Sequence, residues 1–284
     1  DHNPNDVESL GGLKSIATAA EDWQGLVGAL TREAQLVEGG EKEDCARQIA
    51  VLWEERLGDR AVAIESWRRV LELSPGDQAA LKRLVSLAEA DSDWAGFIDD
   101  GKALVHYLEG AERSELLSKM GRASLQHLRR EEEAIRFLDE ASSGDAPSLQ
   151  AAEDLEQIHA ARGSWDRVVD CILRRAHAET GDEAVALFLR AARTRVEQLR
   201  DRKGAAVIYD AVLTIDQKNV QALEFKGDFL FQNNDLEGAV AVFEAIESLG
   251  IERDLDDFDE QMEQGLYCFR FGEALRRLSR TQDA

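Results

Sequence analysis

Residues 22–27 read DWQGLV, and this stretch recurs along the chain as DWAGFI (93–98), SWDRVV (164–169) and DLEGAV (235–240). Each copy begins at the same interval after the one before it, so the chain contains an internal 71-residue repeat. Trp23, Trp94 and Trp165 share one column of this repeat, and Leu236 takes their place in the last copy. A constant spacing of this kind predicts one supersecondary unit that is stacked several times.

The columns around the tryptophans have the period of an α-helix. In the third copy, Val168, Val169 and Ile172 follow the tryptophan at three, four and seven positions, which places them on one helix face. The Asp or Ser before each copy is typical of a helix N-cap, whose side-chain oxygen accepts a backbone N–H. Glycines recur in the same register at Gly39, Gly110 and Gly181. Because glycine readily adopts the left-handed conformation, we expect these residues to end the tryptophan helices.

The composition limits the classes of partner. Among 284 residues, 57 acidic against 34 basic side chains give a net charge of −23, which disfavours binding to nucleic acid or to an anionic membrane. The charge indicates an acidic, solvated surface, with a basic partner as the alternative. No stretch approaches 18 consecutive apolar residues, so we expect no insertion into a membrane.

The three cysteines are far apart and form no CxxC motif. Cys45, Cys171 and Cys268 therefore predict neither a zinc site nor a disulfide framework. Free cysteines fit a reducing compartment, and we expect a cytoplasmic location. The chain starts at Asp1 without a methionine, which we interpret as a segment of a longer protein.

A second helical pattern within each 71-residue unit carries a family resemblance. Ala63 is followed by Trp67 four residues later and by Pro75 beyond the end of the pattern, and the small-then-aromatic pair recurs as Ala205 with Tyr209 and Ala239 with Phe243. This pattern resembles the second helix of the tetratricopeptide repeat (TPR) family. The resemblance implies an all-α fold, a right-handed α-solenoid of about seven TPR-like helical hairpins arranged as a 71-residue double repeat.

The family's usual hairpin length sets the expected boundaries. Two hairpins of about 34 residues leave three further residues per unit, which we place at 41–43, 112–114 and 183–185, after the glycines. The expected hairpins are 7–40, 44–77, 78–111, 115–148, 149–182, 186–219 and 220–253. We expect residues 1–6 to form an N-terminal linker, 7–253 one solenoid, and 254–284 a C-terminal helix that caps the array or starts further repeats.

The sequence contains none of the motifs that would indicate an enzyme. Walker, GxGxxG, GxSxG and HExxH patterns are all missing, so we expect no catalytic residues, no metal and no cofactor. The leading hypothesis is a non-enzymatic scaffold that binds a partner peptide or helix. The alternative is an assembly or regulatory segment of a larger multidomain protein, which acts through its end surfaces or by self-association.

The resemblance also implies where a partner would bind, because the first helices of TPR hairpins line a concave groove. We expect the groove to contain Gln48, Lys82, Lys119, Gln150, Gln157 and Arg190, with Leu52, Ser86, Ala123 and Thr194 beside them. The Lys and Asn set with which some family members hold a C-terminal carboxylate is not matched here. This mixed set of residues favours an extended polar ligand.

Overall fold

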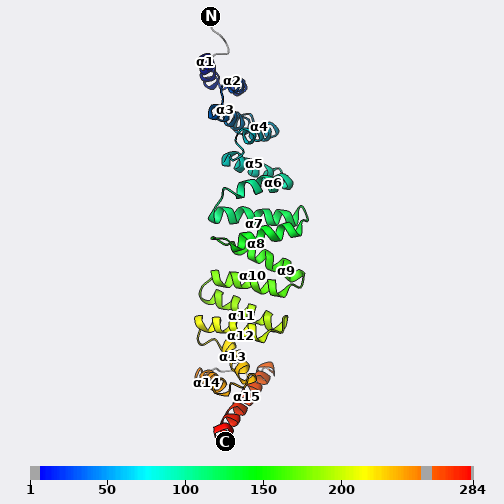
Figure 1. Ribbon diagram of the computed structural model, residues 1–284, viewed down its shortest axis with the longest axis vertical. Coiled ribbons are helices and arrows are strands. Elements are labelled where there is room, and N and C mark those ends of the chain that lie inside the picture. The colour runs from blue at the N-terminus through cyan, green and yellow to red at the C-terminus, as the bar shows by residue number, and fades with distance from the viewer. Residues whose placement is uncertain (1–6, 251–257, 283–284) are drawn as a thin grey trace. The chain divides into compact units, whose positions relative to one another are not determined.

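The computed structural model describes residues 7–250 and 258–282, and within these ranges every regular element is a helix. The chain divides into two compact units, residues 1–147 and 148–284. The boundary falls in the segment between the fourth and fifth helical hairpins (Figure 1). That the hairpins of both units form one right-handed array over 7–253 stays a prediction.

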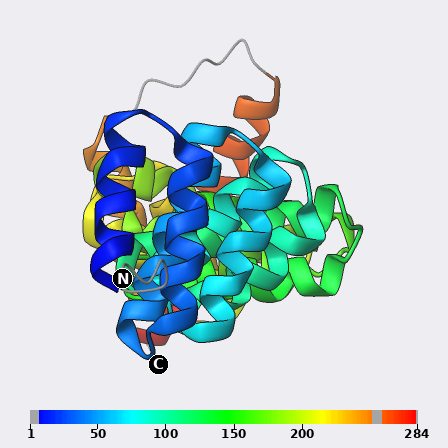
Figure 2. The same cartoon turned by 90° about the horizontal axis from the view of Figure 1, so that it is seen from above.

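Unit 1 consists of four helical hairpins. Its helices are α1 (Val7–Ala19), α2 (Trp23–Leu36), α3 (Gly40–Leu52), the short π-helix η1 (Trp53–Leu57), α4 (Arg60–Leu73), α5 (Gln78–Ala90), α6 (Trp94–Val105), α7 (Gly110–Gln126) and α8 (Glu131–Ser143). Each helix packs on the next one along the chain, and Figure 2 shows the blue and cyan helices side by side in chain order.

Unit 2 consists of three hairpins and a further helix. Its helices are α9 (Leu149–Ala161), α10 (Trp165–Ala178), α11 (Gly181–Glu197), α12 (Arg202–Ile215), α13 (Val220–Gln232), α14 (Leu236–Ser248) and α15 (Phe258–Gln282). Helix α15 packs on both α13 and α14. The structure thus confirms the predicted all-α fold of seven consecutive TPR-like hairpins. The expected linker at 1–6 lies outside the described residues.

The N-caps of the repeated helices are confirmed in three of the four copies. Asp22, Asp93 and Asp235 each accept a hydrogen bond from the backbone N–H three residues later, at 2.9, 3.1 and 3.0 Å. That third residue is a glycine in all three copies, and a Cβ atom there would meet the aspartate carboxylate. Ser164 precedes α10 in the same way but makes no such side-chain bond.

The role expected of the repeated glycines is wrong. Gly39, Gly110 and Gly181 do have positive φ angles of 61°, 54° and 62°. However, Gly110 and Gly181 are the first residues of α7 and α11, and Gly39 is the N-cap of α3, so none of them ends the previous helix. Acidic residues follow each glycine in the first helical turn, where they favour the positive end of the helix dipole. Helices α7 and α11 have 17 residues each, against 13 in α5 and α9, so the three further residues of these units lengthen the first helix.

The small-then-aromatic pairs lie in the core, as the repeat predicts. Ala63, Ala205 and Ala239 are fully buried, so the neighbouring helix can approach their backbone closely. Their partners in the same helices are buried as well: Trp67, Tyr209 and Phe243. Burial raises the pKa of the Tyr209 phenol, since it disfavours the charged form.

The tryptophan column is less buried than a core position. Trp23, Trp94 and Trp165 are each the first residue of their helix and only half-buried, whereas Leu236 is buried. A first-turn side chain lies at the end of the hairpin, where one side of the ring stays open to water. The Trp94 ring stacks on His127 with ring centroids 4.1 Å apart. In the second, third and fourth copies the core lies instead in the columns three, four and seven residues later, whereas Leu26 and Val27 of the first copy are half-buried.

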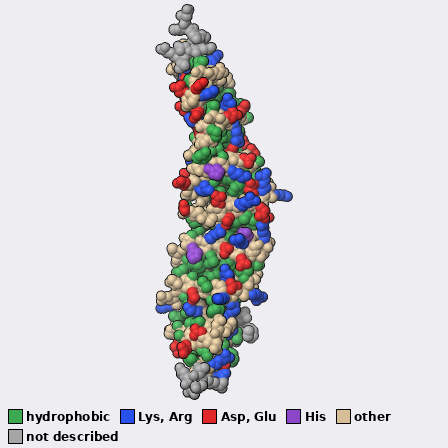
Figure 3. All heavy atoms as spheres, in the orientation of Figure 1, with side chains coloured by type: hydrophobic (Ala, Val, Ile, Leu, Met, Phe, Trp, Pro, Cys, Tyr) green, Lys and Arg blue, Asp and Glu red, His purple; other side chains and the backbone are tan. Residues whose placement is uncertain are grey.

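Ion pairs connect successive hairpins in both units. Arg68 of α4 binds both carboxylate oxygens of the buried Asp100 in α6, and Lys102 of α6 donates to Glu133 of α8 at 2.8 Å. The bond from Lys102 holds the pKa of Glu133 below its usual value. In unit 2, Arg202 of α12 binds Asp228 of α13 at 2.7 Å. Figure 3 shows acidic and basic side chains intermixed over the visible face, which fits this pairing.

Candidate functional site

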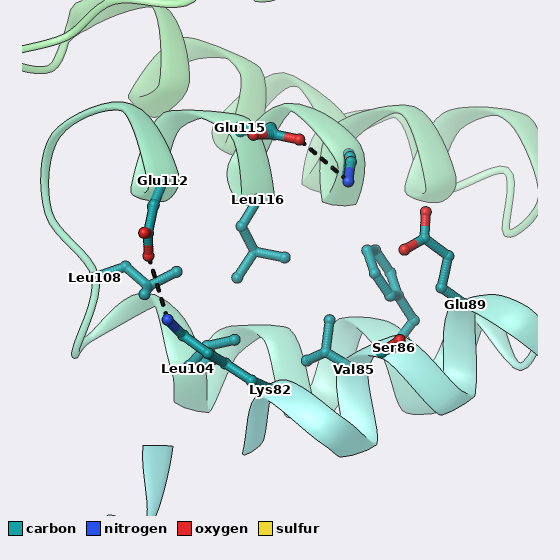
Figure 4. Close-up of a pocket in the computed structure, with 11 residues that line it drawn as sticks. Lys82, Val85, Ser86, Glu89, Leu104, Leu108, Glu112, Glu115 and Leu116 are labelled. Carbon is teal, nitrogen blue, oxygen red and sulfur yellow. Dashed lines mark hydrogen bonds and ion pairs between the residues drawn. The ribbon is translucent and has the colours of Figure 1, made fainter. Parts of the chain in front are cut away.

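A cavity of about 220 Å³ lies in unit 1 between α5 and α7, the first helices of two consecutive hairpins. Its inner surface is apolar, because Val85 of α5, Phe97 and Leu104 of α6 and Leu116 of α7 are all buried around it (Figure 4). Phe97 and Leu104 are seven residues apart on one face of α6, and together with Val85 and Leu116 they form an apolar surface shared by two consecutive hairpins.

The rim of this cavity carries charged side chains. Lys82 pairs with Glu112 at 3.3 Å, which joins α5 to α7, and Lys119 pairs with Glu115 at 3.2 Å within α7 (Figure 4). Glu89 also reaches the rim from α5, and among the described residues its carboxylate has no hydrogen bond or ion pair. The rim thus offers three carboxylates and two ammonium groups around an apolar centre.

Three of the residues expected in the groove lie together at this cavity: Lys82, Ser86 and Lys119. Ala123, expected beside them, is buried in α7 and does not line this cavity. Gln48 is exposed on α3, and Leu52 is half-buried in the same helix.

The remaining expected residues belong to unit 2. Gln150 and Gln157 are exposed on α9, and Gln150 donates to Asp154 of the same helix at 3.2 Å. Arg190 of α11 binds Glu156 of α9 at 2.6 Å, and Arg175 of α10 binds the same carboxylate oxygen at 3.2 Å. Thr194 is half-buried one turn farther along α11 and donates to the Arg190 carbonyl oxygen. The Arg190 side chain is therefore already engaged within unit 2.

A second cavity, of about 240 Å³, lies in unit 2 and was not anticipated from the sequence. Tyr209, Phe225 and Tyr267 contribute aromatic rings to it, and Arg202 and Arg270 both bind Asp228 at its edge. The high phenylalanine content after residue 220 was a signal for an aromatic core in this region. Because Tyr267 packs against Phe243 from α15, this helix closes the apolar face of the last hairpin.

The described residues contain no cluster of three or more His, Cys, Asp or Glu side chains that could hold a metal ion. None of the helices described here has a stretch both long and apolar enough to cross a lipid bilayer. The lining of the cavity in unit 1 consists of apolar and charged side chains, with Ser86 as its single hydroxyl-bearing residue.

Solved structures similar to this chain include several tetratricopeptide repeat proteins. A tetratricopeptide repeat protein from Parabacteroides merdae is 15% identical, with a TM-score of 0.38 over 94% of this chain and 98% of its own. The TPR domain of P58(IPK) is 14% identical, with a TM-score of 0.32 over 99% and 81%. The TPR2AB domain of yeast Sti1, solved as a complex with pHSP90, is 12% identical, with a TM-score of 0.30 over 83% and 99%. No protein-family model and no curated protein matches the sequence.

Proposed function

We propose that this chain is a non-enzymatic scaffold that binds another protein through a peptide segment or a helix lying along the first helices of its hairpins. The observation that carries the proposal is the convergence of Lys82, Ser86 and Lys119, from two consecutive hairpins, on one open apolar cavity. A cavity with an apolar centre and a few polar groups at its rim is the usual form of a binding site.

The chemistry of the lining supports binding over catalysis. Ser86 is the only hydroxyl-bearing residue of the lining, and the lining residues include no histidine that could activate it as a nucleophile. The two ammonium groups are held by glutamates in ion pairs. Such groups recognise a partner and orient it, since each can exchange its ion pair for one with a ligand.

Selection from a random peptide library displayed on phage tests this function. The selected peptides are measured against the wild-type chain and three single variants: Ser86→Trp at the cavity, Gln157→Trp on α9, and Val207→Trp on the exposed face of the second helix α12. We expect tryptophan at 86 or 157 to weaken binding by steric exclusion, and tryptophan at 207 to have no effect. Peptides that are lost only with Val207→Trp would contradict the proposal.

The end surfaces support a second candidate, self-association. Ile16 of α1 is 68% exposed and Phe269 of α15 is 69% exposed, although both are large and apolar. Sedimentation velocity over a range of concentrations separates the candidates. An increase of the sedimentation coefficient with concentration would favour assembly if Ile16→Lys and Phe269→Lys abolish it. A monomer at all concentrations would favour the peptide scaffold.

A further inference from the structure

The cavity of unit 1 occupies a position that the first and fifth hairpins fill with an ion pair, whereas the seventh has Gly227 and Ile246 there. Val85 and Leu104, in the two helices of the third hairpin, stand in the same repeat columns as Lys14 and Glu33 of the first hairpin. Lys14 Nζ donates to both carboxylate oxygens of Glu33, at 2.7 and 2.5 Å. The charged pair of the first hairpin is thus replaced by two aliphatic side chains in the third.

The fifth hairpin has an ion pair at the same two positions, with the charges reversed. Glu156 and Arg175 stand one full repeat after Val85 and Leu104, and they bind each other at 3.2 Å. The reversal shows that the position accepts either polarity, provided that the two charges compensate each other. Between these two cases, the third hairpin presents an apolar surface with open space above it.

We infer that this cavity binds a bulky aliphatic side chain of a partner peptide in which a lysine or arginine stands next to that side chain. The inference rests on the proposed scaffold function and adds the chemistry of its partner. An apolar cavity of about 150 Å³ can hold benzene, so the 220 Å³ found here can accept a leucine or isoleucine side chain.

The charges around the cavity favour a basic neighbour over an acidic one. Glu89 is the rim carboxylate without a partner among the described residues, so a ligand cation can bind it without breaking an existing pair. An acidic ligand would instead have to displace Glu112 or Glu115 from Lys82 or Lys119. Residues 1–147 contain 30 acidic and 17 basic side chains, so unit 1 has a net negative charge whose electrostatic field attracts cations.

The rim glutamates can also serve a ligand cation, because their present ion pairs are weak. The side chains of Lys82 and Glu112 are 51% and 71% exposed. Those of Lys119 and Glu115 are 42% and 68% exposed, so both ion pairs are open to water. Exposed pairs of this kind contribute little to stability. A lysine or arginine of the partner can therefore share Glu112 or Glu115 at small cost, and an acidic ligand could take Lys82 or Lys119 as easily. The preference for a basic neighbour therefore rests on Glu89 and on the net negative charge of unit 1.

A titration followed by methyl NMR tests this inference on the full chain. The probes are three capped peptides with the same Gly-Ser flanks and the central residues Lys-Leu-Lys, Lys-Ala-Lys or Glu-Leu-Glu. We expect Lys-Leu-Lys to shift the methyl signals of Val85, Leu104, Leu108 and Leu116, which line the cavity. The other two peptides should bind about tenfold more weakly, because each lacks one of the two recognised features.

Two variants control for the position of binding. Ser86→Trp fills the mouth of the cavity and should abolish the shifts, whereas Val207→Trp places the same side chain on the exposed face of α12 and should leave them unchanged. Tighter binding of Glu-Leu-Glu at the same methyl groups would overturn the basic partner and leave the scaffold function standing. If none of the three peptides shifts these methyl signals, the inference is wrong, while the library selection judges the scaffold function separately.

Discussion

The α5–α7 cavity of unit 1 and the α9–α11 ion-pair cluster of unit 2 occupy equivalent places in the repeat. Val85, Leu104 and Lys119 of the first correspond, column by column, to Glu156, Arg175 and Arg190 of the second. In unit 2, both arginines bind Glu156 and close the position with charge. In unit 1, two aliphatic side chains leave it apolar and open. The identity of two side chains at equivalent positions of the repeat therefore decides whether the position is closed by an ion pair or left open as a candidate binding site.

The first prediction places one charge in the open position without its counterpart. Val85→Glu puts a carboxylate next to Leu104 and near Glu89 and Glu115, and it should destabilise unit 1 by about 2–3 kcal/mol, because an unpaired charge loses hydration there. Adding Leu104→Arg should recover most of this loss, as the pair of the fifth hairpin does in unit 2. Hydrogen exchange of α5, α6 and α7 measures both changes.

An exposed site provides the control for this prediction. Val207 is 69% exposed on α12, so Val207→Glu should leave hydrogen exchange in both units unchanged. Equal protection in the wild-type chain and in Val85→Glu would contradict the interpretation that the position requires compensated charges.

The second prediction opens the closed position. In Glu156→Val with Arg175→Leu, an ion pair with side chains 18% and 21% exposed is replaced by the aliphatic pair of unit 1. The stability of unit 2 should change by no more than about 1 kcal/mol, since replacing a desolvated ion pair with aliphatic groups is often neutral. The variant also frees Arg190 from Glu156, and Ala160 stands in the column of Glu89, so the opened position should bind the Glu-Leu-Glu peptide, seen as new methyl shifts in α9–α11. A loss of several kcal/mol would contradict this prediction.

The sequence was sufficient to predict the hairpins, because the repeated columns carry the helical period and the helix caps. Asp22, Asp93 and Asp235 cap their helices as expected, and Ala63 with Trp67 lies in the core. The role of the glycines was harder to predict, since a residue with a left-handed backbone conformation can stand just before a helix as well as at the end of one. Gly110, with φ of 54°, begins α7 for this reason.

The candidate site could be predicted only in part. Lys82, Ser86 and Lys119 line one cavity, and their role in binding stays a prediction. The cavity itself depends on how Leu104 of the intervening helix packs beneath them. One signal in the sequence could have indicated it. The 71-residue register aligns Val85 and Leu104 with the ion pair of Lys14 and Glu33, with the reversed pair of Glu156 and Arg175, and with Gly227 and Ile246 in the last copy. Charged and uncharged pairs therefore alternate along the chain.

The third and smallest effect concerns salt. Raising the ionic strength should weaken binding of the Lys-Leu-Lys peptide by a few-fold, because contacts with the exposed carboxylates at the rim are screened. The preference for leucine over alanine should persist, since it depends on apolar burial. Fluorescence anisotropy at two salt concentrations checks both effects. A leucine preference that disappears at high salt would mean that the apolar surface is not the site of contact.

The most direct test of the comparison transfers the ion pair of the first hairpin into the third. In Val85→Lys with Leu104→Glu, the position should close as it does around Lys14 and Glu33. The account predicts that hydrogen exchange in unit 1 stays near the wild-type pattern, while the affinity for the Lys-Leu-Lys peptide falls by about tenfold or more. Unchanged affinity in this folded double variant would contradict the claim that the open aliphatic pair is the binding site.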